Sequence, residues 1–338
     1  MKVENIHRKD TGLFSEHQVR LSYDQEGLSA YLHRPFSKEA IAEQMKLKSG
    51  QFSGEQRNLL VNVLLAQNEK SMAQALRSNI ESLGKDSTFT VTTGHQLTLL
   101  AGPLYFLLKI IHVVKLAEEL SKVNSENHIV PVYWMASEDH DFEEIQSTNL
   151  FNKHLTYDYQ QRGPVGKFEL IEFDAFKAEI LAFFGEDKQK EIKRLLKAYT
   201  GENLAEATRG IVSELFSEYG LVIIDGDDKA LKSSFAPIMK SELVDRRSEQ
   251  CVLATNEQLK DDGLKVQVFP RPINLFYCVK GSRARIEFED GIYTSGDKSW
   301  SETEILTALD DGADTFSPNV VLRPVYQELI LPNLAYIG

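Results

Sequence analysis

Residues 88–136 read TFTVTTGHQLTLLAGPLYFLLKIIHVVKLAEELSKVNSENHIVPVYWMA, and this stretch decides the fold. It opens with a β-branched and aromatic run at 89–93, which is typical of a strand. Pro103 then stands where a helix can begin, and the segment after it is apolar to about Leu120. The continuous apolar run at 129–136 has the length of a second, fully buried strand. Strand, long helix and buried strand in this order predict a βαβ unit of a parallel sheet.

Further apolar runs extend this pattern toward the end of the chain. Residues 220–227, GLVIIDGD, predict a third buried strand that ends in acidic residues. Residues 319–322 and 334–337 are the remaining strand candidates, and Asp290-Gly291 between apolar arms predicts a hairpin. Together these runs predict an α/β protein with a parallel sheet at its centre.

The rest of the chain is arranged around this sheet. We expect residues 1–87 to form a mainly helical N-terminal segment. Residues 88–338 would form the core, with inserts near 151–216 and 260–316.

Local signals predict several elements outside the sheet. Ser37 and Ser53 stand where two helices can begin, and the second pattern continues to about Leu83. Residues 168–173 are a short strand candidate, and residues 188–215 predict two charged helices interrupted near a Thr-Gly pair. The helix after Pro103 is apolar around most of its circumference, so we expect it to be almost entirely buried.

The composition excludes several classes of protein. The 338 residues are 42% hydrophobic and 26% charged, which suits a globular protein with a real core. A net charge of −12 argues against a nonspecific nucleic-acid or anionic-membrane surface, so we expect neither partner. The two cysteines, Cys251 and Cys278, are far apart and form no zinc or disulfide pattern.

The sequence pattern also predicts neither a signal peptide nor a membrane-spanning segment. The opening MKVENIHRKDTG is polar, and the longest apolar stretch, near 97–108, is interrupted by Gly102 and Pro103. We therefore expect a cytoplasmic protein. The chain closes with LILPNLAYIG, a strand entering a turn, from which we expect the sequence to be part of a longer protein.

The first candidate site follows the strand at 89–93. Thr92-Thr93-Gly94-His95-Gln96 resembles the H/T-x-G-H motif of the nucleotidyltransferase and class I synthetase superfamily. Glycine allows a ligand to approach the backbone, and an imidazole beside it can stabilise a phosphate oxygen. The alternative is a turn whose histidine makes only local hydrogen bonds.

The second candidate site follows the strand at 129–136. Asp139, His140 and Asp141 could bind a divalent metal, or their carboxylates could hold a substrate ammonium group. We favour the ammonium and predict no metal, because the spacing defines no coordination cage. Glu143 and Glu144 are better explained as solvated acids at a helix N-terminus.

Two weaker candidates complete the set. Asp225 could bind a ribose or substrate hydroxyl, or it could cap the next helix. Arg323, after the strand candidate at 319–322, would suit a carboxylate or phosphate, with Gln327 just beyond it. Three arginines near the predicted hairpin are other candidates for such a contact, although side chains there are usually solvated: Arg271, Arg283 and Arg285.

Three stretches together resemble the family of bacillithiol biosynthesis cysteine-adding enzymes. They are VTTGHQLTLLAGPLYFLLKI from Val91, PVYWMASEDHDFEEI from Pro131 and SPNVVLRPVYQELILPNLAYIG from Ser317. The similarity runs from about Thr88 to the end of the chain. Where members of the family commonly have a second glutamine after the glycine, this chain has His95.

The resemblance implies a Rossmann-like core with two connective inserts and a C-terminal coiled coil that makes the full-length protein a homodimer. It implies a purine nucleotide site between the core and the coiled coil, and this chain ends before that coiled coil. It also implies a ligase that adds L-cysteine to the amine of glucosaminyl-malate, with ATP or another adenine nucleotide as the expected cofactor.

Roles for the candidate residues follow from this activity. Gly94 and His95 would contact phosphate, next to Thr93, and Gln96 would orient a substrate carbonyl. Asp139 and Asp141 would hold the amine, and His140 would take a proton from it. Arg323 would face a carboxylate, with Gln327 and Asp225 also contacting substrate. The alternatives are a nucleotide-binding scaffold without chemistry, and a nucleotidyltransferase that acts on a sugar phosphate.

Overall fold

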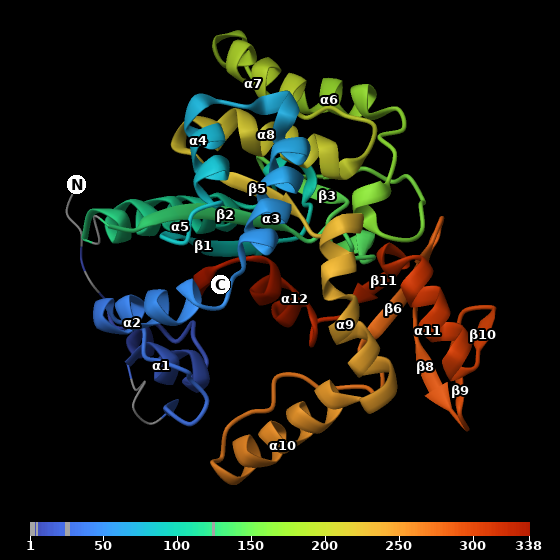
Figure 1. Ribbon diagram of the computed structural model, residues 1–338. Coiled ribbons are helices and arrows are strands. Elements are labelled where there is room, and N and C mark those ends of the chain that lie inside the picture. Colours follow the sequence, from blue (N-terminus) through green and yellow to red (C-terminus); the bar gives the residue numbers. More distant parts are fainter. Residues whose placement is uncertain (1–3, 5, 24–27, 124–125) are drawn as a thin grey trace.

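The computed structural model describes residue 4 and residues 6–23, 28–123 and 126–338. At its centre is a four-stranded parallel sheet in the order β12-β1-β2-β5 (Figure 1). Its strands are β1 (Thr88–His95), β2 (His128–Met135), β5 (Val222–Asp225) and β12 (Asn333–Ile337). Helices pack on both faces, so the predicted α/β fold around a parallel sheet is confirmed.

The predicted βαβ unit is present. Helix α5 (Leu104–Val123) connects β1 to β2, which pair in register from Thr88 opposite His128 to His95 opposite Met135. The expected near-complete burial of α5 was wrong, because only one side of the helix contacts the sheet. Its outer side exposes Leu104, Leu108 and Ile111. Among the described residues, no helix is long and apolar enough to cross a bilayer.

Strand β12 lies on the opposite side of β1 from β2. The Thr90 and Thr92 hydroxyls donate to Oδ1 of Asn333 at 3.2 and 2.8 Å, and the Thr93 hydroxyl donates to the Ile337 carbonyl at 2.7 Å. The chain therefore runs from β1 to β2 and β5 in one direction and returns to the other side of β1. Ligands of open α/β sheets bind where the strand order reverses in this way.

The N-terminal helices are α1 (Glu16–Tyr23), α2 (Lys38–Ser49), α3 (Gly54–Asn68) and α4 (Gln74–Ser82). Ser37 and Ser53 cap α2 and α3, as predicted. The single helix expected to reach Leu83 is instead two helices. The Asn68 amide donates to the Leu64 carbonyl at 2.8 Å and to the Ile223 carbonyl of β5 at 3.0 Å, which ends α3 against the sheet.

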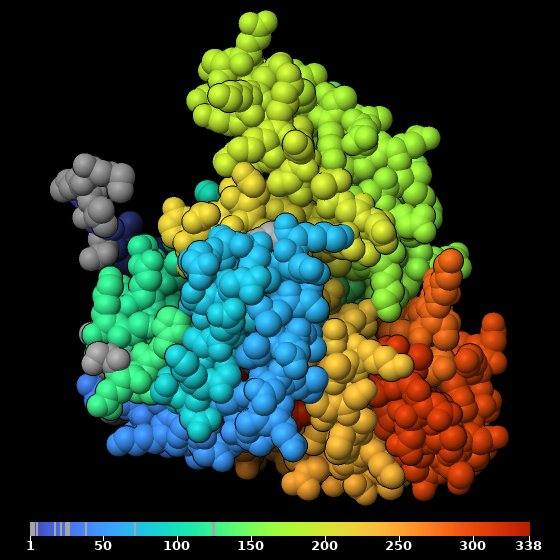
Figure 2. All heavy atoms as spheres, turned by 45° about the horizontal axis from the view of Figure 1, so that its top comes forward, coloured from blue at the N-terminus to red at the C-terminus, as the bar shows by residue number. Residues whose placement is uncertain are grey.

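Alternate residues of β2 face two separate cores. Val132 and Trp134 pack with α3, α4 and α9 (Lys229–Asp245), whereas Tyr133 and Met135 face α5 and the first insert. Figure 2 shows α3 and α4, in blue to cyan, beside the gold α9. This period of two is the one expected for a strand that is buried on both faces.

The first insert contains the hairpin β3 (Ser147–Leu150) and β4 (Lys153–Thr156), followed by α6 (Phe173–Leu181), α7 (Glu186–Ala198) and α8 (Leu204–Phe216). The predicted pair of charged helices is confirmed as α7 and α8. The strand predicted at 168–173 was wrong: this segment makes one isolated bridge, Glu169 to Asn203, before α6 begins.

The second insert follows α9 and α10 (Arg247–Asp261) and forms two small sheets, β11-β6-β7 and β10-β9-β8. Its elements are β6 (Leu275–Val279), β7 (Ser282–Arg285), β8 (Glu287–Glu289), β9 (Ile292–Ser295), β10 (Lys298–Trp300), α11 (Glu302–Asp311) and β11 (Phe316–Pro318). The hairpin predicted at Asp290-Gly291 joins β8 to β9.

The strand predicted at 319–322 was wrong. Asn319 Oδ1 accepts from the backbone N–H groups of Val321 and Leu322 at 2.8 and 3.3 Å, which bends the chain into a turn. Helix α12 (Arg323–Ile330) starts directly after this turn. Arg323 therefore opens a helix instead of following a strand.

Candidate active site

The carboxyl ends of β1, β2 and β5 meet at one edge of the sheet. The pairing places His95 beside Met135, and Met135 beside Asp225. The loops that carry His95, Asp139 and Asp225 therefore start side by side, as the sequence predicts. This is the edge outside which open parallel sheets bind their ligands.

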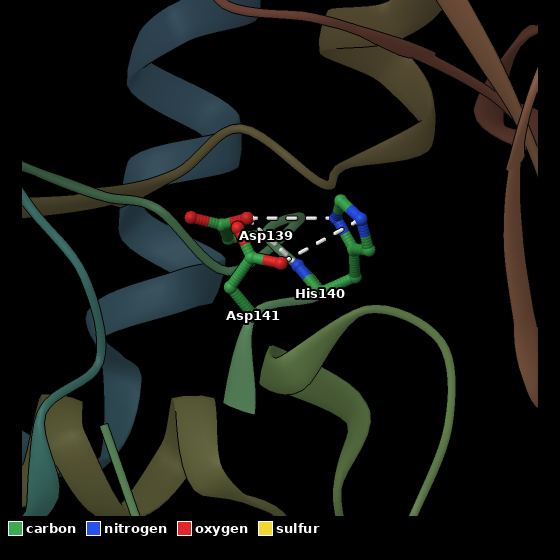
Figure 3. A group of neighbouring side chains, drawn as sticks. All are labelled: Asp139, His140 and Asp141. Carbon is green, nitrogen blue, oxygen red and sulfur yellow. Dashed lines mark hydrogen bonds and ion pairs between the residues drawn. The ribbon is translucent and has the colours of Figure 1, made fainter. Parts of the chain in front are cut away.

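The loop after β2 brings Asp139, His140 and Asp141 together (Figure 3). Asp139 Oδ1 lies 3.6 Å from Nδ1 of His140, and Asp141 Oδ1 lies 3.7 Å from Nε2. The backbone N–H of His140 also donates to Asp139 Oδ1 at 2.8 Å. The three side chains are between 29% and 54% exposed, so a ligand can reach them.

Gln96 connects the loop after β1 to this cluster. Its Nε2 donates to Asp139 Oδ2 at 3.1 Å and to Glu144 Oε2 at 2.7 Å. Glu144 is exposed, as predicted for a solvated acid, but its contact with Gln96 was not predicted. The neutral N–H donor of Gln96 thus lies between two carboxylates. An ammonium group at this position would find the same two acceptors, and its positive charge would be attracted by their negative charges.

A residue of the second insert reaches the cluster. Arg283, on β7, places NH1 2.9 Å from Nδ1 of His140, and its guanidinium lies over the Phe276 ring at 3.8 Å. Among the candidate arginines near the predicted hairpin, Arg283 therefore contacts the cluster. A residue 143 positions away from its partner leaves no local signal in the sequence.

The cluster offers three metal-ligand atoms within 4.8 Å of one another, from Asp139, His140 and Asp141. The positive charge of the Arg283 guanidinium would repel a metal ion at this point. The guanidinium also donates a hydrogen bond to Nδ1 of His140, so this lone pair is not available to a metal. The absence of a metal from these residues stays a prediction.

His95 lies with its ring against Phe106, at 4.8 Å between ring centres, and edge-on to Tyr105. Burial, with a smaller contribution from Lys109, lowers the pKa of His95 to about 4. Its Nε2 is buried and makes no hydrogen bond to the described residues. His95 is therefore a neutral imidazole at pH 7, and its Nε2 lacks a hydrogen-bond partner among the described residues.

The low pKa of His95 predicts a specific loss of stability in acid. In the unfolded chain the ring takes up a proton near pH 6.5, whereas in the folded protein it does so only near pH 4. Stability is therefore lost as the pH falls from about 6.5 toward 4. Between pH 7 and pH 5 we expect wild type to lose about 1–2 kcal/mol more than His95→Gln in urea unfolding. Parallel losses in both proteins would contradict this.

Comparison with known proteins shows the family of this chain. A family model described as "Bacillithiol biosynthesis BshC, N-terminal Rossmann-like domain" matches residues 1–338. The chain belongs to this family. The Rossmann-like character of the core that the sequence implied is thereby confirmed.

Curated relatives carry the name "Putative cysteine ligase BshC". The chain is 44% identical to the Flavobacterium psychrophilum protein over 311 residues, which cover 89% of this chain and 57% of that protein. It is 42% identical to the Flavobacterium johnsoniae protein and 28% identical to the Bacillus velezensis protein, in each case over 100% of this chain and 65% of the relative. The chain thus spans less than two thirds of these relatives.

Two residues of the motif at the end of β1 serve the sheet itself. Thr93 is fully buried, and its hydroxyl is engaged with the Ile337 carbonyl, so it is not open to a substrate. At Gly94, a Cβ would lie 2.8 Å from the Tyr336 hydroxyl. A side chain at this position would therefore displace the hydroxyl end of Tyr336 on β12.

Cationic groups lie beside Gly94. Lys109 Nζ donates to the Gly94 carbonyl at 2.9 Å, and burial, followed by the nearby charge of Arg323, lowers its pKa. Gln327, one turn after Arg323 on α12, is buried, and its Oε1 makes no hydrogen bond to the described residues. Lys109, Arg323 and the free nitrogen of His95 together suit an anionic group such as phosphate.

Asp225 does not cap α9, because Asp228 does so. Its Oδ1 accepts from the Ser137 hydroxyl and from the Asp227 backbone N–H, and burial raises its pKa. Asp225 also lines a cavity of about 930 Å³ outside the end of β5, together with Arg209 and Ser213. This volume falls within the range of small-molecule sites.

A buried ion cluster holds the loops after β2 and β5 in place. Lys232 of α9 is fully buried and lies 2.7 Å from Glu138 Oε1 and 2.6 Å from Asp227 Oδ1. Although burial disfavours its charge, these two carboxylates raise the pKa of Lys232 above its usual value. Glu138 precedes Asp139, so Lys232 fixes the backbone that presents the acidic cluster.

Proposed function

We propose that this chain provides the core of a ligase that joins the carboxyl group of L-cysteine to the amine of glucosaminyl-malate, in bacillithiol biosynthesis. The observation that carries the proposal is the cluster of Asp139, His140 and Asp141 beside Gln96 at the carboxyl edge of the sheet. Paired carboxylates in this position favour a bound ammonium. The name of the curated relatives points to the same class of reaction.

Amide formation requires a carboxyl group with a good leaving group, which a bound adenine nucleotide such as ATP would supply. Lys109, Arg323 and Nε2 of His95 would hold its phosphate groups beside Gly94. Because His95 is neutral at pH 7, it would contact phosphate through a hydrogen bond and not through charge.

The acidic cluster would position the amine. Asp139 and Asp141 hold it as an ammonium, and loss of a proton to one of these carboxylates frees the nitrogen lone pair. The nitrogen then forms a bond to the carboxyl carbon of cysteine as the bond from that carbon to the leaving group breaks, and the second proton of the nitrogen passes to the departing group. His140 is not the base in this scheme, because Arg283 occupies the lone pair that a base would use.

The cavity beside Asp225 would hold the sugar. It borders Ser137 and Gly166, and the backbone of Gly166 donates to the Ser137 carbonyl at 2.8 Å in the loop that leads to Asp139. Its walls carry more carboxylates than bases, which suits a polyhydroxylated amine. We place the reaction in the cytoplasm and expect the full-length enzyme to be a homodimer.

The direct test uses the full-length protein with L-cysteine, glucosaminyl-malate and ATP, followed by mass spectrometry. We expect a product with the summed mass of cysteine and glucosaminyl-malate less one water, and none when ATP is omitted. Transfer of a nucleotidyl group to a sugar phosphate, without the amide, would favour the nucleotidyltransferase alternative. Binding of nucleotide with neither product would favour a scaffold.

A further inference from the structure

The ring of His140 is held in one tautomer by a neighbouring cation. Arg283 NH1 lies 2.9 Å from Nδ1. A guanidinium group carries only donors, so Nδ1 must accept this hydrogen bond through its lone pair. In the neutral ring the single proton is therefore on Nε2.

Arg283 is itself fixed by the second insert. Its Nε and NH2 each lie 3.2 Å from the Ser317 hydroxyl, NH2 lies 3.3 Å from the Pro318 carbonyl, and the Phe276 ring supports its face. Together with the contact of NH1 to His140, these contacts engage all three guanidinium nitrogens. Arg283 is therefore poorly placed to turn toward a substrate anion, and well placed to orient His140.

The Nε2–H of His140 can still donate a hydrogen bond to a ligand. Asp141 Oδ1 is 3.7 Å away, which is too far for a hydrogen bond, and the side chain of His140 is 41% exposed. The ring thus presents an N–H group at the place where Asp139 and Asp141 would hold the amine.

The geometry points to Arg283 as a positioning residue that keeps His140 a hydrogen-bond donor, so that Nε2–H stabilises the oxyanion formed when the amine attacks the activated cysteine carbonyl. This assignment rests on the proposed ligase reaction. As the nitrogen bonds to carbon, the electron pair of the C=O bond moves to oxygen, and His140 Nε2–H donates to that oxygen. The C=O bond re-forms as the leaving group departs with its own electron pair and takes up the second proton of the amine, and His140 keeps its proton throughout.

The kinetic test exploits the difference between a donor and a base. Glutamine can place an amide N–H near the position of Nε2 but cannot titrate. We therefore expect His140→Ala to lower kcat on the order of 100-fold, as removal of an oxyanion donor does, and His140→Gln to lower it much less. If His140 acted as a base, both variants would lose the same activity, which would overturn the proposal.

Arg283 is tested through its coupling to His140. We expect Arg283→Met to lower kcat on the order of 10-fold with KM for the amine unchanged, and to cost little when His140 is already glutamine. Arg285→Met is the matched control, because it removes the same charge two residues along β7 from an exposed position. If Arg283→Met lowers kcat equally in the wild-type protein and in His140→Gln, the proposed coupling is overturned.

A second readout needs no activity and separates this inference from the proposed function. Diethyl pyrocarbonate modifies an unprotonated imidazole nitrogen, and in His140 that nitrogen is the one covered by Arg283. In the full-length protein we expect His140 to react several-fold faster in Arg283→Met than in wild type, with exposed His112 as the internal reference. Equal rates would refute the tautomer assignment. Slow labelling of His140 in a wild-type protein that forms no amide would support the tautomer and refute only the ligase reaction.

Discussion

Replacing Lys232 by methionine is expected to lower the free energy of unfolding by about 3–5 kcal/mol, because it strips a buried cation from its partners. Lys232 is fully buried between Glu138 and Asp227. Asp227 would keep Lys167, at 2.8 Å from its Oδ2, whereas Glu138 would be left without a counter-charge at 13% exposure. Urea unfolding followed by tryptophan fluorescence measures the loss, since Trp134 lies in the adjacent core.

The control for this variant is on the same helix. Lys229, in the first turn of α9, is exposed, so Lys229→Met should change stability by no more than about 0.5 kcal/mol. The double variant Lys232→Met with Glu138→Gln should recover part of the loss, because it removes the unpaired charge. If Lys232→Met and Lys229→Met unfold at the same urea concentration, the buried cluster does not stabilise the fold.

The second large effect concerns activity. We expect Asp139→Asn in the full-length enzyme to lower kcat/KM. The loss corresponds to about 2–4 kcal/mol of transition-state stabilisation, while the melting temperature hardly changes. The amide keeps an acceptor for the His140 backbone N–H but loses the charge that would hold an ammonium. Product formation and thermal unfolding, measured side by side, test both parts.

Glu143→Gln provides the comparison for Asp139→Asn. It removes one negative charge from the same loop at an exposed position. We expect it to retain activity, because the proposed amine site does not include it. Full activity with a lowered melting temperature in Asp139→Asn would assign Asp139 to the fold and end the ammonium proposal.

The parts of the fold that could be predicted are those that local sequence determines. Strands β1 and β2 are β-branched or continuously apolar runs bounded by polar residues, and α5 is a long apolar helix between them. Their order fixes a parallel sheet, and a parallel sheet places His95, Asp139 and Asp225 at one edge. These predictions required no knowledge of distant contacts.

The errors arose where a side chain overrides the pattern of its neighbours. Residues 320–322 are β-branched and apolar like a strand, yet the carboxamide of Asn319 bonds to the backbone ahead and forms a turn. In the same way Asn68 ends α3 by bonding to a strand 155 residues away. A propensity that is summed over a window cannot detect one such hydrogen bond.

The candidate site was predictable only in part for a similar reason. Asp139, His140 and Asp141 are adjacent in sequence, so their cluster is visible in the letters. Arg283 and Lys109 reach the same edge from an insert and from a helix face, where lysine and arginine usually mean a solvated surface. Thr93 shows the reverse error, since a motif residue that resembles a ligand contact is used to attach β12.

The late arrival of β12 has a consequence for synthesis on the ribosome. Strand β1 leaves the ribosome long before Asn333, and at about 5–20 residues per second the interval is roughly ten seconds to a minute. During this time β2 and then β5 can pair on one side of β1. The other side of β1 has unpaired backbone groups, with which a strand of another chain could pair. The hydroxyls of Thr90 and Thr92 also lack their acceptor, Asn333, during this interval. We therefore expect a nascent chain that stalls before residue 333 to be more prone to aggregation than one that includes β12.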